Sequence, residues 1–402
     1  MSNFGEQGVP TDLDWTTDFD HTHPAYNEHA PEIWTDLRVR CPVAHSDRFG
    51  GVWLPTRHAE VSQIAYNTDD YTSMGVIVAP SPPATPPPLG VAPPITSDPP
   101  AHGPARRLLL PAFSPKGIAA WEGTTRELCR ELIDDLPVEN GVVDAAVHYA
   151  QHIPVRVIAA MLGLPAEDGD RFRRFIHDII EAPGSGADRP EEETLGYYLD
   201  QQIERRRREP GDDLITFLLR AEYEGEPLTP DHVVGTVLLL LIAGIDTTWS
   251  AIGATLWHLA THPDDRRRLV AEPDLVPTAM EEMLRAYAPV TMARIAARDH
   301  DLAGCPVRQG DWLLLPFPAA NRDPAVFDRA DEVIIDRARN RHSAFGLGIH
   351  RCLGSNLARL ELRVAIEEWL AAVPEFTLAD GATVRWSPGQ VRGPRTVPVA
   401  IG

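Results

Sequence analysis

A single cysteine, Cys352, lies in a segment with little side-chain bulk, FGLGIHRCLG at residues 345–354. The residues after it keep an apolar stripe at helical spacing, formed by Leu353, Leu357, Leu360 and Val364. Cys352 therefore stands at the N-terminal edge of a predicted helix, where the helix dipole and free N–H groups favour a thiolate. Such a sulfur can be a nucleophile or a metal ligand, although a lone cysteine is commonly inert core.

The surroundings of Cys352 favour a metal ligand. No local cysteine-protease signature surrounds it. Gly346, Gly348, Gly354 and the small Ser355 let a flat group approach the backbone, which an inert core cysteine does not need. A haem is a flat group that takes one protein thiolate, because the porphyrin nitrogens occupy the equatorial positions, the thiolate binds on one face, and the other face stays open for oxygen. The segment thus predicts a haem-thiolate site.

A second group of reactive side chains interrupts an apolar segment. A helix is expected to begin near Thr229, which is a possible N-cap before Pro230, and to continue to Pro263. Asp246, followed by Thr247 and Thr248, lies in the middle of this helix. Burying a carboxylate is costly unless a partner or a reaction uses it. A threonine in mid-helix more often only bonds back to a carbonyl one turn earlier.

These motifs resemble those of the cytochrome P-450 family over almost the whole chain. F-G-x-G-x-H-x-C-x-G at residues 345–354 is similar to the family's haem-binding signature, and AGIDTT at 243–248 is similar to its oxygen-activating helix. The resemblance makes Asp246 and Thr247 the acid–alcohol pair. A hydroxyl backed by a carboxylate can relay the two protons that cleavage of dioxygen consumes.

The resemblance also identifies a structural clamp for the haem loop. EEMLR at residues 281–285 matches the family's E-x-x-R motif, with Glu282 and Arg285 three residues apart. Arg337 stands where the family places a second arginine that completes this buried pair. Arginine suits such a network because its guanidinium binds carboxylates in a bidentate manner.

The implied cofactor is haem b, with Cys352 as the axial ligand of its iron. Phe345, Gly346 and Gly354 would surround it within the signature. Its two propionates need positive partners in a dry pocket, and three stretches resemble the family's solution. These stretches contribute His102 and Arg106, four residues apart on one helical face, as well as Arg294 and His350.

The resemblance assigns the substrate walls to several loops and to the apolar part of the long helix. Their apolar residues predict a hydrophobic pocket: Val76, Ile77, Val78, Leu89, Val91, Ile242, Ala243, Val290 and Met292.

The elements that must position these residues are mostly helices. Helical periodicity is expected over residues 104–110, 119–136, 151–163, 168–182 and 192–208. Short strands are expected near residues 50–55, at 311–321 and as a terminal pair within 383–401. The predicted fold class is mainly α with a small β-sheet region (α+β), the cytochrome P-450 fold, in one domain over residues 1–402. The proline-rich stretch 79–100 is either an interdomain linker or, as we favour, a stiff loop packed on that domain.

Composition limits the partners and the compartment. A formal net charge of −21 makes nucleic acid a poor partner, because polyanions would be repelled. The longest apolar run of the long helix, residues 233–245, is shorter than the roughly 20 residues that cross a bilayer. The N-terminus has no signal-peptide pattern, and the widely spaced cysteines suit a reducing compartment. We therefore expect a cytoplasmic monomer without a membrane anchor.

The expected activity is that of a haem-thiolate monooxygenase, which activates O2 with two electrons and hydroxylates or otherwise oxidises a hydrophobic small molecule. No flavin or iron–sulfur motif is visible, so a ferredoxin or flavodoxin with its NAD(P)H-dependent reductase would supply the electrons. Residues 337–360 contain five arginines and no acidic residue, which suits an acidic partner. Two alternatives stay open: a peroxide-driven haem enzyme, which would not need Asp246 and Thr247, and a non-catalytic haem-binding sensor.

Overall fold

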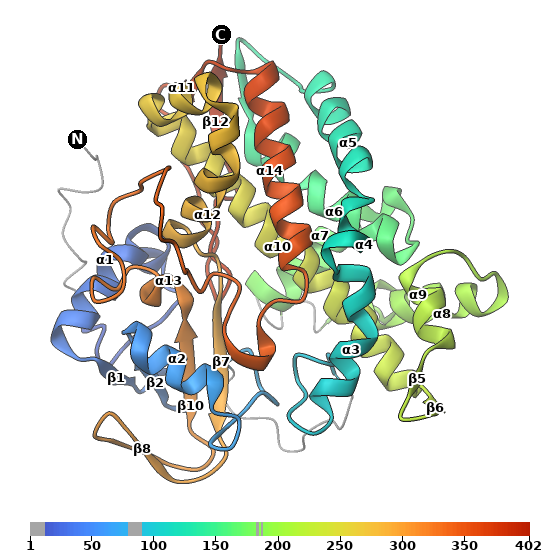
Figure 1. Cartoon of the computed structure of the whole chain (residues 1–402), viewed down its shortest axis with the longest axis vertical. Coiled ribbons are helices and arrows are strands. Elements are labelled where there is room, and N and C mark those ends of the chain that lie inside the picture. The colour runs from blue at the N-terminus through green and yellow to red at the C-terminus, as the bar shows by residue number, and fades with distance from the viewer. Residues whose placement is uncertain (1–12, 79–90, 182–184, 186–187) are drawn as a thin grey trace.

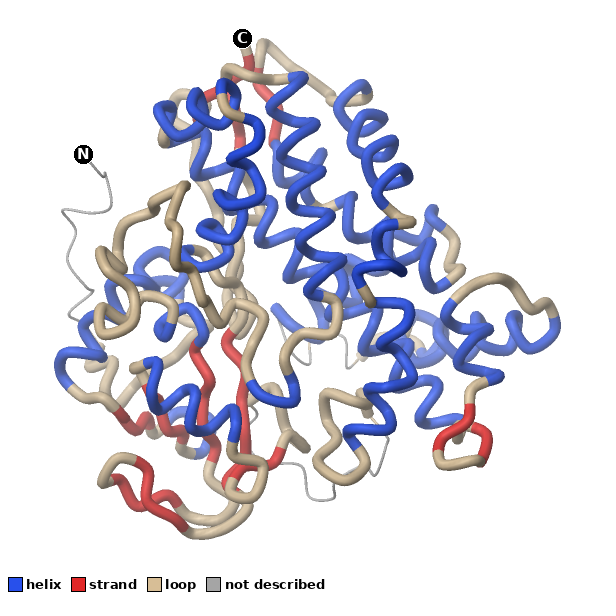
Figure 2. The backbone as a smooth tube through the Cα atoms, in the orientation of Figure 1, coloured by secondary structure: helices blue, strands red, loops and turns tan. Residues whose placement is uncertain are grey.

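The five-stranded sheet and the long helices occupy different parts of the molecule. The computed structural model describes residues 13–78, 91–181, 185 and 188–402. The sheet lies beside α1 (Pro24–Arg40) and α2 (His58–Tyr66), and the longest helices lie on its other side (Figures 1 and 2). The sequence-based fold class, mainly α with small β-sheets, is confirmed.

The five-stranded sheet has the order β1-β2-β10-β7-β3 and joins the first and last thirds of the chain. Its central strand, β10, is buried along its whole length, as its continuous apolar sequence WLLLP requires. Side chains alternate between the faces of a strand, so Met292 and Arg294 of β7 share one face. The strands are β1 (Val43–Ser46), β2 (Val52–Pro55), β3 (Tyr71–Thr72), β7 (Thr291–Ala296) and β10 (Trp312–Pro316).

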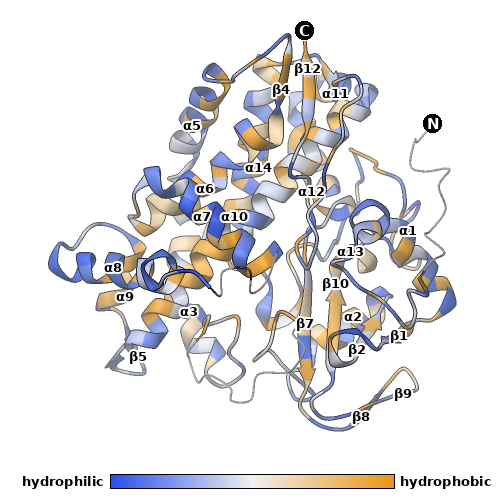
Figure 3. Cartoon of the chain, turned by 180° about the vertical axis from the view of Figure 1, so that it is seen from behind, coloured by the Kyte–Doolittle hydropathy of each residue, from blue (hydrophilic) through white to orange (hydrophobic). Residues whose placement is uncertain are grey.

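The long helix α10 (Pro230–Thr261) runs through the middle of the molecule. Its N-cap is Thr229, whose hydroxyl accepts a hydrogen bond from the backbone N–H of His232 at 3.2 Å. Figure 3 shows hydrophobic residues on α10 and hydrophilic residues on the outer helix α8 (Leu195–Arg208). Among the described helices, α10 alone is long and apolar enough to cross a membrane, but 61% of its most apolar window is buried inside the protein. Its burial identifies it as the core helix.

The other helices pack around α10 and around α14 (Ser355–Ala372), which follows the Cys352 segment. They are α3 (His102–Phe113), α4 (Pro115–Ala119), α5 (Glu122–Asp134), α6 (His152–Leu162), α7 (Gly169–Ile176), α9 (Leu214–Arg220), α11 (Pro263–Ala271) and α12 (Val276–Ala286). The short helix α13 (Phe317–Ala320) packs instead on α1, α2 and β7.

The small sheets complete the fold, and one of them corrects a prediction. The terminal pair of strands expected within residues 383–401 is reduced to one antiparallel bridge between Trp386 and Pro394, and β12 (Pro398–Ile401) is the strand formed there. It pairs with β11 (Phe376–Leu378) and with β4 (Val142–Asp144). Pro388 and Pro394 lack the N–H groups that a longer ladder needs. The remaining strands form the hairpins β5 (Glu222–Tyr223) with β6 (Glu226–Pro227) and β8 (His300–Leu302) with β9 (Cys305–Val307).

Candidate active site

One cavity of about 230 Å³ brings together side chains from three parts of the fold. The Cys352 segment forms one wall, the middle of α10 forms another, and β7 with the start of α3 closes the rim. The lining includes every residue that sequence analysis assigned to the cofactor, namely His102, Arg106, Arg294, Phe345, Gly346, His350, Cys352 and Gly354.

The Cys352 segment is folded so that its sulfur faces this cavity. The backbone N–H of Cys352 donates to the carbonyl of Phe345 at 2.7 Å, which closes the loop. Gly348 has a φ of +67°, and a Cβ there would lie 2.2 Å from the carbonyl oxygen of Ala65 in α2. The glycine is therefore needed for packing of the loop on α2 and not for approach of a flat ligand.

Two opposing effects act on the Cys352 thiol: burial disfavours the charged thiolate, and nearby positive groups favour it. Burial raises the pKa of the Cys352 thiol, whereas a hydrogen bond from the backbone N–H of Gly354 lowers it. Arg106, Arg351 and Arg359 lower this pKa further. A Cβ at Gly354 would meet nothing closer than the Cys352 sulfur, at 4.0 Å. The sulfur thus keeps an open side toward the cavity.

Four basic side chains gather at the rim of the cavity without carboxylate partners. Arg294 is 5% exposed and donates to the carbonyl of Ala293 at 2.7 Å. Burial lowers the pKa of Arg294 to about 10 and, together with the nearby cations, lowers the pKa of His350 to about 2. The buried Nε2 of His102 has no hydrogen-bond partner. Among the described residues, no acid lies within 4.0 Å of Arg106 or Arg294, so the cluster is suited to an anionic ligand.

On the opposite wall, Thr247 lies on the face of α10 that borders the cavity, together with Ala243 and Gly244. The Thr247 hydroxyl donates to the carbonyl of Ala243 at 3.1 Å. Gly244 also packs against α6, since a Cβ there would lie 3.0 Å from Ile158. α10 is continuous at this glycine.

Asp246 lies on a different face of α10 and does not line the cavity. Its Oδ1 accepts a hydrogen bond from Arg395 at 2.6 Å, and Arg395 also pairs with Glu181. Burial raises the pKa of Asp246 to about 6, against the lowering effect of Arg395. Sequence analysis missed Arg395 and Glu181, because they lie 149 residues after and 65 residues before Asp246 in the chain and no motif marks them.

Glu361 is a second carboxyl that sequence analysis missed, and it does line the cavity. It is 1% exposed, and neither of its oxygens has a hydrogen-bond partner of good geometry. Burial raises its pKa well above the usual range, and a hydrogen bond from Thr248 lowers it. A glutamate four residues after Leu357 in an apolar helical stripe is the signal that could have found it.

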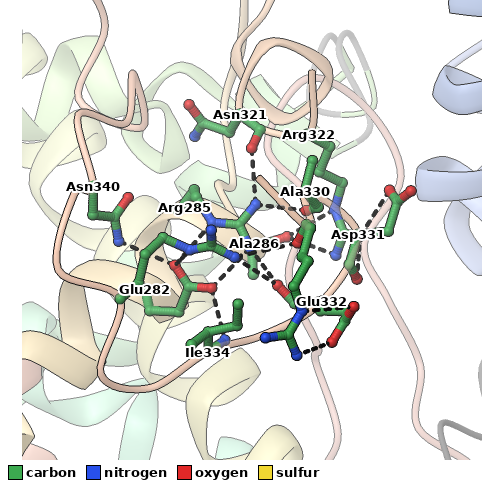
Figure 4. Close-up of polar contacts among 12 residues, drawn as sticks. Glu282, Arg285, Ala286, Asn321, Arg322, Ala330, Asp331, Glu332, Ile334 and Asn340 are labelled. Atoms are coloured by element: carbon green, nitrogen blue, oxygen red, sulfur yellow. Dashed lines mark hydrogen bonds and ion pairs between the residues drawn. The ribbon is translucent and has the colours of Figure 1, made fainter. Parts of the chain in front are cut away.

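Glu282 is the centre of a buried network (Figure 4). Its two oxygens accept from Nε and Nη2 of Arg285, both at 2.8 Å, and one also accepts from Nε of Arg337 at 2.9 Å. The backbone N–H of Ile334 and the side chain of Asn340 complete the shell at 2.8 and 3.1 Å. The three charged residues predicted as a clamp are therefore in direct contact, and they hold the chain that leads to the Cys352 segment.

Some of the predicted substrate residues line the cavity and others do not. Ala243, Val290 and Met292 line the cavity, and Leu89 lies outside the described residues. Ile77 and Val91 are 37% and 61% exposed, Val78 belongs to the core cluster beside α1, and Ile242 packs against the helical core. The five predicted residues absent from the described lining are Val76, Ile77, Val78, Val91 and Ile242. The lining residues Pro94, Ile95, Leu239 and Leu240 were not named individually, although they lie in the stretches 75–95 and 239–243 that the resemblance assigns to the substrate walls.

The cavity fits a haem on the chemistry of its walls. One thiol and one helix that bears a threonine hydroxyl line it, and Arg106, Arg294 and the unpartnered Nε2 of His102 could bind the propionates. Fold and site together define a haem-thiolate protein.

Comparison with known proteins agrees. The family model Cytochrome P450 matches residues 190–373. The mycinamicin IV hydroxylase/epoxidase of Micromonospora griseorubida is 35% identical over 90% of this chain and 91% of its own. The vitamin D(3) 25-hydroxylase of Pseudonocardia autotrophica is 36% identical over 97% and 96%. The crystal structure of CYP109E1 from Bacillus megaterium in complex with testosterone has a TM-score of 0.83 and 31% identity over 92% and 97%. The chain belongs to the cytochrome P450 family, and it is a haem-dependent monooxygenase of that family.

Proposed function

We propose that this monooxygenase takes two electrons from a separate redox protein and inserts one oxygen atom into a hydrophobic small molecule. The observation that carries the proposal is the placement of Cys352 and Thr247 on opposite walls of one cavity with a basic rim. Strands from the first and last thirds of the chain share a sheet, which supports a single domain. The free cysteines suit a reducing cytoplasm.

In this proposal the haem supplies the activation of dioxygen, and the chain supplies binding, protons and exclusion of water. Cys352 would hold the iron, while His102, Arg106, Arg294 and His350 would bind the propionates. The Thr247 hydroxyl would donate a proton into the cavity. Asp246, one residue earlier on α10, would restore that proton through water, since its pKa of about 6 lets it change protonation near neutral pH.

The proposed substrate is apolar because the wall above the basic rim is apolar. Leu239, Leu240, Val290 and Met292 line this part of the cavity. These side chains offer burial of hydrocarbon and no hydrogen bonds, so they favour a substrate with few polar groups. The names of the relatives mention mycinamicin IV and vitamin D(3), and the solved structure holds testosterone, which supports the same class.

The proposed electron donor is an acidic ferredoxin or flavodoxin that docks on the side of the Cys352 segment. Of the five arginines in residues 337–360, Arg339, Arg341 and Arg351 are exposed. Arg337 belongs to the Glu282 network and Arg359 pairs with Glu281 at 2.7 Å, so these two are not available for docking. Three exposed arginines without a nearby acid in that stretch still form a basic patch on an acidic protein.

The decisive test is the ligand of the iron. Purified, haem-loaded protein is reduced and exposed to carbon monoxide, and the Soret band should show the red shift that sulfur ligation produces. Cys352→Ser should lose this band, whereas Cys129→Ser, a buried cysteine elsewhere, should keep it. A wild-type adduct without the shifted band contradicts the proposal.

Two further outcomes separate the alternatives. A compound library is screened for molecules that shift the haem from low to high spin, and hits are tested for turnover with ferredoxin, reductase and oxygen. Turnover sustained by peroxide alone favours a peroxide-driven enzyme. Tight binding of gas or ligand without turnover in either system favours a sensor.

A further inference from the structure

A second cavity, of about 100 Å³, lies between α1, the C-terminal half of α10 and the chain before β12. It shares no described lining residue with the haem cavity, and the short segment 288–290 separates the two. Five aromatic side chains line it: Tyr26, Trp34, Trp257, Tyr287 and Trp386. Nothing in the proposed reaction uses this cavity.

Arg392 is the first of two guanidinium groups in the lining. Its Nη2 and Nε donate to the carbonyl of Asn27 at 2.7 and 3.1 Å, and its guanidinium lies 4.1 Å from the ring centre of Trp386. In the part of the chain that the structure describes, no carboxylate lies within 4.0 Å of Arg392. Arg392 is half-buried, and a cation held there by one carbonyl and one ring is only partly compensated.

Arg322 is the second guanidinium, and it is 7% exposed. It donates to the backbone carbonyls of Ala286 and Asp331 at 3.0 and 3.5 Å, and the Asp331 carboxylate lies 3.9 Å away (Figure 4). The Asp331 side chain is 69% exposed, so solvent screens most of its charge. Arg322 is therefore also short of a strong anionic partner.

Arg322 and Arg392 line the same cavity. Burial lowers the pKa of Arg392 to about 10, while Tyr26 and Glu32 raise this pKa and Arg322 lowers it. Glu32 acts on both arginines from beyond ion-pair distance, and one of its buried oxygens has no hydrogen-bond partner. Glu28 lines the exposed mouth of the cavity. An anion bound in the cavity would give both guanidiniums the close anionic partner that neither has.

The aromatic walls define what else a ligand must carry. The ring of Trp257 is nearly perpendicular to those of Trp386 and Tyr287, with ring centres 5.3 and 5.6 Å apart. Rings in this arrangement present faces and edges that pack against a further planar ring. A cavity of about 150 Å³ in another protein holds benzene, and the cavity here is smaller, so its ligand contains at most one ring.

We propose that this cavity binds a small aromatic monocarboxylate, with the carboxylate between Arg322 and Arg392 and the ring against the tryptophans. The guanidinium geometry matches a planar carboxylate, and the aromatic walls match a single flat ring. The site is separate from the haem cavity, so its occupation does not depend on the proposed reaction.

Calorimetric titration of the haem-loaded protein with benzoate tests this proposal. 4-Phenylimidazole, which occupies the haem iron, is present throughout, so that benzoate cannot bind in the haem cavity. Saturable binding is expected, and benzyl alcohol, which keeps the ring but lacks the charge, should bind at least about tenfold more weakly. No saturable benzoate binding, or equal binding of benzyl alcohol, overturns the proposal.

Three variants locate the site. Arg392→Gln should weaken benzoate at least about tenfold, and Ala30→Leu, which fills the cavity from α1, should abolish binding while leaving both arginines in place. Arg385→Gln removes an exposed arginine of the same loop outside the lining and should bind as the wild type does. Far-ultraviolet circular dichroism and the haem spectrum check that each variant is folded. Wild-type affinity in both Arg392→Gln and Ala30→Leu overturns the assignment.

Discussion

Arg395 controls the protonation of Asp246, and replacing it should move the titration of that carboxyl upward. Arg395 bonds Asp246 at 2.6 Å in a site where the aspartate is 2% exposed. An opposite charge at such a distance lowers a carboxyl pKa by about 1–3. In Arg395→Gln this effect is lost while burial and Glu181 still raise the pKa. The pKa of Asp246 should therefore rise from about 6 to roughly 7–9.

Arg395→Gln should also change how the free energy of unfolding depends on pH. The folded-state pKa of Asp246, about 6, lies above the reference value of 3.8. Its favourable contribution to folding is therefore complete at low pH and is lost as the pH rises from about 4 through 6. In Arg395→Gln the loss continues to higher pH, at about 1.4 kcal/mol for each pH unit that the pKa rises. Glu181→Gln should act in the opposite direction, because it removes a neighbouring negative charge.

Infrared spectroscopy measures this titration without a substrate. The C=O stretching band of a protonated carboxyl group should titrate near pH 6 in the wild type and disappear in Asp246→Asn, which assigns it. Glu361→Gln removes the band of the buried carboxyl that lines the cavity, and Arg385→Gln is the control for loss of an exposed arginine. An unchanged titration in Arg395→Gln, or a downward shift, would refute the reasoning.

Three further predictions concern the clamp, the loop and the relay. Glu282→Gln should lower the free energy of unfolding by about 3–5 kcal/mol in urea titrations, because it leaves two buried arginines without their carboxylate. The control Glu332→Gln, at an exposed ion pair, should lower it by less than about 1 kcal/mol. Gly348→Ala should destabilise by more than about 1 kcal/mol, while Gly123→Ala in open space on α5 should stabilise slightly. With a substrate from the screen, Thr247→Ala should reduce product formed per oxygen consumed several-fold; unchanged coupling contradicts the relay.

That residues 345–354 would line a cavity could be predicted because a local motif marks them. The segment 345–354 contains its own glycines, cysteine and helix start, and it needs no distant residue to be recognised. Long apolar helices were predictable for a related reason: α10 has a Thr-Pro start and an apolar composition that few other structures can bury. What these signals share is that the determining residues are close in sequence.

The partners of buried charges were not predictable, because they come from distant parts of the chain. Asp246 was expected to need a partner, but no spacing rule connects it to Arg395, which follows an irregular loop after Trp386. The substrate wall has the same difficulty. Val78 looked available in sequence, yet its backbone N–H is held by the Gln390 side chain at 2.6 Å and it packs beside α1.

Buried charges in this protein fall into two kinds, and the difference indicates their roles. The carboxylate of Glu282 is fully paired, because arginine side chains and a backbone N–H of the protein bind it, so its removal should affect both stability and haem-loop geometry. Arg294 and Arg392 lack a close carboxylate: each donates mainly to a backbone carbonyl, and each lines a cavity. Because an uncompensated buried charge is costly, such a charge is retained where a ligand completes it. By this reasoning the pair Arg322 and Arg392 requires an anion as much as the basic rim around Arg294 does.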